Sequence, residues 1–142
     1  MSNNVTTEDI ELDKKGPQLY RCKLVRIVDA DTLVCDIDLG FQVTLTKQWI
    51  RFMGIDTPES RTRNLEEKAL GLAAKARTKE LVGSVWDGKS GKRFMLRTYK
   101  EKGKYGRILG EPLTIDGESV CDVLIREGHA YAYWGGKKKA WT

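Results

Sequence analysis

The sequence has few cysteines, a single histidine and no long apolar run. Its three cysteines, Cys22, Cys35 and Cys121, lie far apart and form no CxxC pair, which argues against a disulfide framework and against a zinc site. The single histidine, His129, has no partner motif, so zinc or histidine chemistry is not expected. No segment approaches the length of a membrane span, and the first residues lack the basic start and apolar stretch of a secretory signal. We therefore expect an intracellular, cytoplasmic protein, for which a phage or plasmid is one suitable origin.

The charge balance of the chain is basic. Lys and Arg number 25 against 20 Asp and Glu, which gives a net charge of +5 over 142 residues. Such a balance suits a polyanionic partner such as nucleic acid, although many basic proteins bind none. The length is that of one domain with one site.

The hydrophobic pattern divides the chain into three parts. Residues 1–18 are polar and aperiodic, which predicts a flexible N-terminal arm. Residues 19–134 carry the periodic apolar pattern of a folded domain. Residues 135–142 contain the stretch GGKKK and form a basic C-terminal tail.

Alternating side chains predict a domain that is mainly β. Residues 19–28, 33–39 and 41–46 each alternate between apolar and polar positions, and together they predict a meander of three strands. In the third of these strands we expect Phe41, Val43 and Leu45 to face the core. Two further strands are predicted at residues 93–99 and 107–115.

Two segments have the period of a helix. The inward stripe predicted for residues 65–82 consists of Leu65, Ala69, Leu72 and Ala76. Asn64 precedes this helix as a cap, Gly83 follows it, and a shorter helix is expected between Ser119 and Gly128. These elements predict an α+β fold: a five-stranded, antiparallel, OB-fold-like barrel with one long and one short helix.

Polar side chains gather at the predicted strand ends. They are Asp31, Arg51, Asp56, Thr57, Glu59 and Arg107. Two carboxylates and a carbonyl suit a hard cation such as Ca²⁺, a third carboxylate suits proton transfer, and guanidinium groups bind phosphate oxygens. These are the parts needed for phosphodiester hydrolysis, although each residue alone also fits a structural role in a turn or a surface ion pair. Strict alternation from Arg51 would direct Asp56 to the opposite face, so we expect a bulge or bend at Gly54.

Three segments resemble the signature segments of the staphylococcal nuclease (thermonuclease) family: VDADT, IRFMGIDTPES and KYGR. The likeness extends from about Tyr20 to Trp134. The roles it implies are calcium carboxylates for Asp31 and Asp56, a carbonyl ligand for Thr57, phosphate-binding arginines for Arg51 and Arg107, a general base for Glu59, and nucleotide-phosphate contacts for Lys104 and Tyr105. The resemblance thus implies a calcium-dependent nuclease that acts on DNA, with RNA as an alternative, and leaves 5′-hydroxyl and 3′-phosphate ends.

The sequence also departs from the family pattern. Gly103 stands where family members often carry Asp. The chain ends soon after its aromatic stretch where the familiar secreted enzyme continues into a third helix, so we expect a homodimer as one way to cover that face. Tyr131, Tyr133 and Trp134 either stack on a base or pack under the barrel, and residues 137–139 would then meet backbone phosphates.

Two other functions fit the same sequence. One is a catalytically inactive OB-fold module that binds nucleic acid; such copies usually lose acids or arginines of the site, whereas here all are present. The other is a protein-interaction domain that binds its partner through the exposed aromatic tail. Neutralising basic residues or raising the salt concentration should weaken nucleic-acid binding steeply and should leave such a protein contact almost unchanged.

Overall fold

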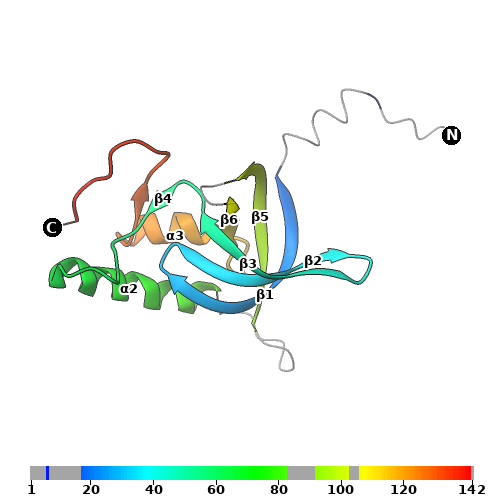
Figure 1. Ribbon diagram of the computed structural model, residues 1–142, viewed down its shortest axis with the longest axis horizontal. Helices are drawn as coiled ribbons and strands as arrows, with labels where there is room; N and C mark the ends of the chain where they lie inside the picture. Colours follow the sequence, from blue (N-terminus) through cyan, green and yellow to red (C-terminus); the bar gives the residue numbers. More distant parts are fainter. Residues whose placement is uncertain (1–5, 7–16, 83–91, 103–105, 142) are drawn as a thin grey trace.

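The strands form a closed five-stranded barrel in the computed structural model, which describes residue 6 and residues 17–82, 92–102 and 106–141 (Figure 1). The strands are β1 (Gln18–Asp29), β2 (Thr32–Gly40), β3 (Val43–Phe52), β5 (Arg93–Lys102) and β6 (Ile108–Pro112). Their order around the barrel is β1-β2-β3-β6-β5. The expected OB-fold-like α+β architecture is confirmed, but one pair, β3 and β6, is parallel rather than antiparallel and closes the barrel.

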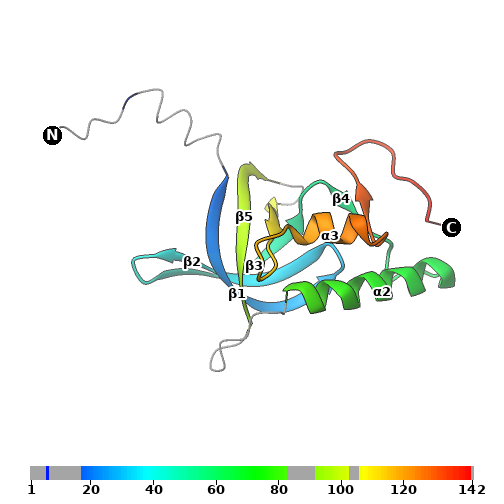
Figure 2. The ribbon, with the colours of Figure 1, turned by 180° about the vertical axis from the view of Figure 1, so that it is seen from behind.

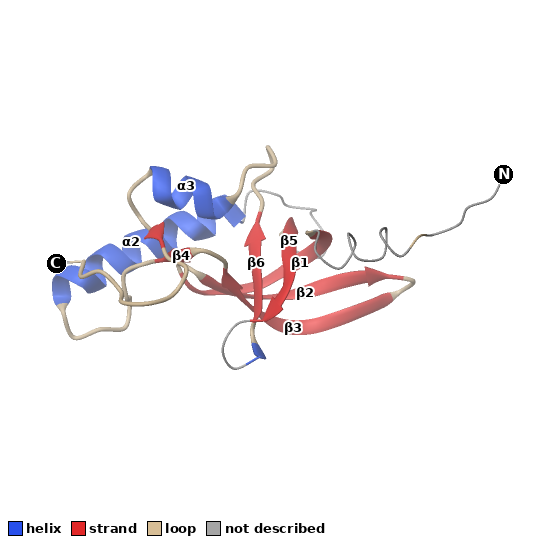
Figure 3. Cartoon of the chain, turned by 90° about the horizontal axis from the view of Figure 1, so that it is seen from above, coloured by secondary structure: helices blue, strands red, loops and turns tan. Residues whose placement is uncertain are grey.

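Two helices and a small second sheet lie at one end of the barrel (Figures 2 and 3). They are α2 (Leu65–Val82), α3 (Val120–Arg126) and the strands β4 (Ile55–Asp56) and β7 (Tyr131–Ala132). β4 and β7 pair antiparallel, with Asp56 opposite Tyr131. Asn64 caps α2 as expected, since the Glu67 N–H donates to Asn64 Oδ1 at 3.1 Å.

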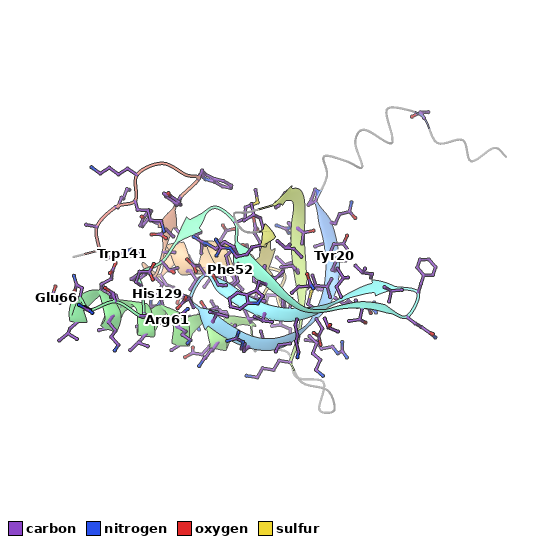
Figure 4. The ribbon with its side chains drawn as sticks, in the orientation of Figure 1. Tyr20, Phe52, Arg61, Glu66, His129 and Trp141 are labelled. Atoms are coloured by element: carbon purple, nitrogen blue, oxygen red, sulfur yellow. The ribbon has the colours of Figure 1, made fainter. Side chains whose placement is uncertain are left out.

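The inward positions of the alternating strands fill the barrel. Leu33, Ile50 and Leu96 are fully buried, and Cys22 and Cys35 lie in the same cluster. Figure 4 shows Phe52 among the strands, where its side chain is 1% exposed. The three cysteines are free and buried.

The hairpin of β2 and β3 extends past the barrel, and here the predicted inward face is wrong (Figure 1). Phe41 is 100% exposed, and Val43 and Leu45 are also exposed. β1 pairs with β2 only as far as Asp38, so the hairpin tip has no neighbouring layer to cover it. Phe41 and Gln42 both have positive φ, as the two central residues of a type I′ turn require.

The buried side of α2 also differs from the predicted stripe. Leu65 is 78% exposed and Leu72 is 50% exposed, whereas the buried residues are Gly71, Ala74, Thr78 and Val82. Small residues face inward because the helix approaches the rest of the chain closely. Thr78 Oγ1 donates to the Ala30 carbonyl at 2.7 Å, which fixes α2 to the turn between β1 and β2.

Several expectations lie outside the described residues or stay predictions. Most of the expected arm, together with Gly83 and the pair Lys104 and Tyr105, belongs to the segments that the structure does not describe. The homodimer and the three-part division of the chain stay predictions. No helix in the described part of the chain is long and apolar enough to cross a membrane.

Candidate active site

The centre of the candidate site is Arg51, which lies between two carboxylates. Its Nη1 is 3.2 Å from Asp31 Oδ2 and its Nη2 is 3.8 Å from Asp56 Oδ1. The strand register explains the first contact, because Arg51 pairs with Thr32 and the Phe52 N–H donates to the Asp31 carbonyl at 2.8 Å. The fold therefore brings together three of the residues that the sequence predicted for the site.

A turn at Met53 and Gly54 brings Asp56 to the side of Arg51. β3 ends at Phe52 and β4 begins at Ile55, with Gly54 at a φ of 79° between them. The expected break in alternation at Gly54 is confirmed. The Arg51 guanidinium stabilises this turn, since it donates to the carbonyls of Phe52 and Ile55 at 3.0 Å each.

The neighbourhood of Asp56 is buried. Asp56 and Thr57 are both 5% exposed. The Tyr131 hydroxyl donates to Asp56 Oδ2 at 3.0 Å, and β7 holds Tyr131 directly opposite Asp56. Burial raises the pKa of Tyr131 above its ordinary value, and its hydrogen bond to Asp56 raises that pKa further. The phenol is therefore a neutral donor at neutral pH.

The C-terminal segment brings a second cation to Asp56. Lys138 Nζ is 3.3 Å from Asp56 Oδ1, with the lysine side chain 54% exposed. The segment is held in place because the Lys139 N–H donates to the Tyr131 hydroxyl at 2.9 Å and the rings of Tyr131 and Trp141 lie 5.2 Å apart. Lys138 therefore contacts a carboxylate, and the phosphate contacts expected of residues 137–139 stay a prediction.

The loop that carries Glu59 is anchored on both sides. Ser60 Oγ donates to Asp29 Oδ1 at 2.7 Å, and Arg61 pairs with Asp29 Oδ2 at 3.0 Å. On the other side, a Cβ at Gly71 would lie 2.6 Å from the Glu59 carbonyl carbon and oxygen, so α2 touches this backbone directly. Glu59 itself is exposed. The anchored backbone leaves its carboxylate facing solvent.

The remaining predicted residues lie around this centre. Arg107 precedes β6 and borders a surface hollow together with Trp49. Tyr133 is half-buried, and its hydroxyl donates to the Gly136 carbonyl at 2.7 Å. Trp134 is 74% exposed, although its ring lies against Gly54, where a Cβ would come within 2.6 Å of the ring. Both residues contact the turn of the candidate site, since the Tyr133 N–H donates to the Gly54 carbonyl at 2.8 Å, and base stacking by these side chains stays a prediction.

The donor set fits a hard divalent cation. Asp31 and Asp56 supply carboxylate oxygens, and the Thr57 carbonyl follows Asp56 directly. The Lys138 ammonium beside Asp56 Oδ1 shows that this position favours a positive charge. No cluster of three acidic, histidine or cysteine side chains occurs among the described residues.

Two contacts of the candidate site were not predicted from the sequence. Asp29 anchors the Glu59 loop, and Lys138, which was expected near phosphates, contacts Asp56. An Asp two positions before a candidate metal ligand is a weak signal of an anchoring role. No local pattern indicates that Lys138, rather than Lys137 or Lys139, would reach Asp56.

Comparison with known proteins identifies relatives of this chain. The sequence model of the family described as "Staphylococcal nuclease homologue" matches residues 49–140. Endonuclease YncB of Bacillus subtilis (strain 168) is 34% identical over 117 residues, which cover 82% of this chain and 50% of that protein. The SPbeta prophage-derived endonuclease YokF of the same strain is 34% identical over 113 residues, which cover 80% of this chain and 34% of that protein. An uncharacterised endonuclease of Escherichia coli is 30% identical over 112 residues, which cover 78% of this chain and 60% of that protein. The chain thus spans about half the length, or less, of the first two relatives.

Proposed function

Because the chain belongs to the staphylococcal nuclease homologue family, we propose that it is a calcium-dependent nuclease that hydrolyses phosphodiester bonds of DNA, with RNA as a second substrate. The observation that carries the proposal is Arg51 between Asp31 and Asp56, at 3.2 and 3.8 Å. A guanidinium fixed between two carboxylates combines a phosphate-binding group with metal-binding oxygens at one point. The endonuclease names of the three relatives support the same activity.

In the proposed reaction Glu59 accepts a proton from the attacking water. The water oxygen bonds to phosphorus, the bond from phosphorus to the 5′ oxygen breaks, and that oxygen takes up a proton. The products carry 5′-hydroxyl and 3′-phosphate ends. Arg51 and Arg107 stabilise the negative charge that grows on the phosphate oxygens.

Calcium, when bound, would supply further positive charge to the phosphate, and Asp31, Asp56 and the Thr57 carbonyl are the groups that would hold it. Residues of the chain itself orient these groups and contact the substrate. Tyr131 orients the Asp56 carboxylate through the hydrogen bond at 3.0 Å, and Asp29 orients the loop of Glu59 through Ser60. Lys104, Tyr105 and the aromatic side chains of Tyr131, Tyr133 and Trp134 are proposed as substrate contacts.

The test is cleavage of labelled single-stranded and double-stranded DNA with Ca²⁺ and with EDTA. Glu59→Gln is the test variant, and Glu66→Gln is its matched control because Glu66 is an exposed carboxylate in the first turn of α2. We expect calcium-dependent cutting that Glu59→Gln reduces by at least about a hundredfold and Glu66→Gln leaves unchanged. Intact DNA in every lane, from a folded protein that still retards DNA on a gel, would instead establish the inactive binding module.

A further inference from the structure

A basic hollow with an exposed tryptophan lies on the outer face of the barrel, beside the candidate site. Its volume is about 380 Å³, and its lining consists of Lys47, Gln48, Trp49, Gly106 and Arg107. Among the side chains that the structure describes, no acidic one belongs to this lining. Trp49 is 44% exposed, and the Arg26 guanidinium lies over one face of its ring, 5.2 Å from the ring centre. Trp49 thus lies near three cationic side chains, those of Lys47 and Arg107 in the lining and that of Arg26. An aromatic ring near cations is an arrangement with which proteins bind a nucleobase and its phosphates.

The strand register connects this hollow to the candidate site. Ile50 and Phe52 point into the barrel, so Trp49 and Arg51 both lie on its outer face. In the parallel pair of β3 and β6, Ile50 lies opposite Ile108, which places Arg107 next to Trp49. Two residues along a strand span roughly 6.5 Å. This separation is comparable to one nucleotide unit of an extended strand, so Trp49 stands about one nucleotide from Arg51.

A β-bulge directs Lys47 into the hollow. The pairing of β2 and β3 shifts between Cys35 and Ile37, and Lys47 has a φ of 51°, a conformation that a lysine rarely adopts. The Lys47 N–H donates to Asp36 Oδ1 at 2.9 Å and so holds this backbone in place. Bulges redirect side chains, and this one places an ammonium at the edge of the hollow.

We propose that this hollow, with Trp49 as its stacking platform and Lys47 and Arg26 as phosphate contacts, binds a nucleotide of a single-stranded nucleic acid next to the phosphate held by Arg51 and Arg107. The proposal rests on the proposed function for its substrate class. It adds a preference: a base can lie flat on Trp49 only when it is not paired and stacked within a duplex. The site therefore favours single-stranded DNA or RNA, or unpaired ends.

The test is direct binding of a fluorescent octathymidylate without metal, in EDTA and low salt, measured by anisotropy. Trp49→Ala should weaken binding by about tenfold, whereas Trp49→Phe, which keeps an aromatic face, should stay within about threefold of the original. Phe41→Ala is the matched control, because Phe41 is a fully exposed aromatic residue at the hairpin tip, outside the hollow; its binding should not change. Lys47→Ala should make the slope of log binding constant against log salt concentration shallower, by the amount expected for about one phosphate contact.

The outcomes separate this inference from the proposed function. If Trp49→Ala binds the octathymidylate within twofold of the original protein, stacking at Trp49 is wrong whether or not the protein cleaves DNA. If the tenfold loss occurs in a protein that cleaves nothing under any condition, the stacking site stands and the nuclease proposal fails. Circular dichroism of each variant confirms that the loss does not arise from unfolding.

Discussion

The Lys138 ammonium lies 3.3 Å from Asp56 Oδ1, at the oxygen that also faces Arg51. A lysine from the last residues of the chain therefore occupies the surroundings of a proposed metal ligand. A cation that binds Asp56 must compete with this ammonium. The Asp56 carboxylate is buried, but the lysine side chain is 54% exposed, so solvent screens its charge and the competition is expected to be mild.

Lys138→Ala should strengthen calcium binding by about two- to fivefold, the amount that a solvent-screened ion pair contributes. The measurement is the dependence of the melting temperature on calcium concentration, which requires no substrate. Lys137→Ala is the control, because this neighbouring lysine is exposed. Identical calcium titrations for both variants and the original protein would show that Lys138 does not compete.

Arg51→Ala should abolish activity and also destabilise the fold by about 2–4 kcal/mol. The reason is that it leaves the Asp31 and Asp56 carboxylates without their shared guanidinium and removes two hydrogen bonds to carbonyls in the turn. Urea denaturation measures the free energy of unfolding. Arg61→Ala provides the comparison and should cost less than about 1 kcal/mol, because that side chain is 72% exposed in its pair with Asp29. Equal stability of the two variants would show that Arg51 acts on substrate alone.

Gly71→Ala should lower both stability and activity, although alanine is normally the better helix residue by about 1 kcal/mol. The added Cβ would lie 2.6 Å from the Glu59 carbonyl, so α2 and the loop must separate. We expect a loss of about 1–3 kcal/mol in unfolding free energy and at least about tenfold in cleavage rate. Leu72→Ala, on the exposed face, should change neither. A stabilised Gly71→Ala variant with full activity would contradict the close contact.

Stability should fall above about pH 9. Burial raises the pKa of Cys121 from 9.0 to about 12, and the pKa of Cys35 also lies far above its ordinary value because of its hydrogen bond with Cys22 and its burial. Between about pH 9 and pH 12, the Cys121 thiol has released its proton in the unfolded chain but keeps it in the folded protein. The free energy of unfolding therefore decreases by about 1.4 kcal/mol per pH unit for each such thiol.

The control for this pH effect is Cys121→Ala. Denaturation measured at several alkaline pH values should give a shallower decline for the variant than for the original protein, by about 1.4 kcal/mol per pH unit. The absolute stability of the variant differs because a buried side chain is shortened, so only the slope is compared. Parallel pH profiles would show that Cys121 ionises in the folded protein as readily as in the unfolded chain.

The sequence predicted the features that depend on a local pattern of residues. Alternation located the strands, and a parity argument located the break at Gly54, because both depend on neighbouring residues alone. It failed for Phe41 and for Leu72, since both are apolar residues whose burial depends on whether another layer covers them. The contact of Lys138 with Asp56 joins residues that lie far apart in the sequence, and no periodicity in the chain encodes it.

The pairing of β4 with β7 sets the order in which the site is completed. Asp56 and its neighbours leave the ribosome long before Tyr131 and Lys138, which supply the phenol and ammonium around that carboxylate. The strands of the barrel all precede Tyr131 in the sequence, so a partly synthesised chain contains them while Asp56 still lacks this cover. The surroundings of Asp56 are therefore complete only once Tyr131 and Lys138 have been synthesised, and a chain interrupted before Tyr131 would lack both of these groups.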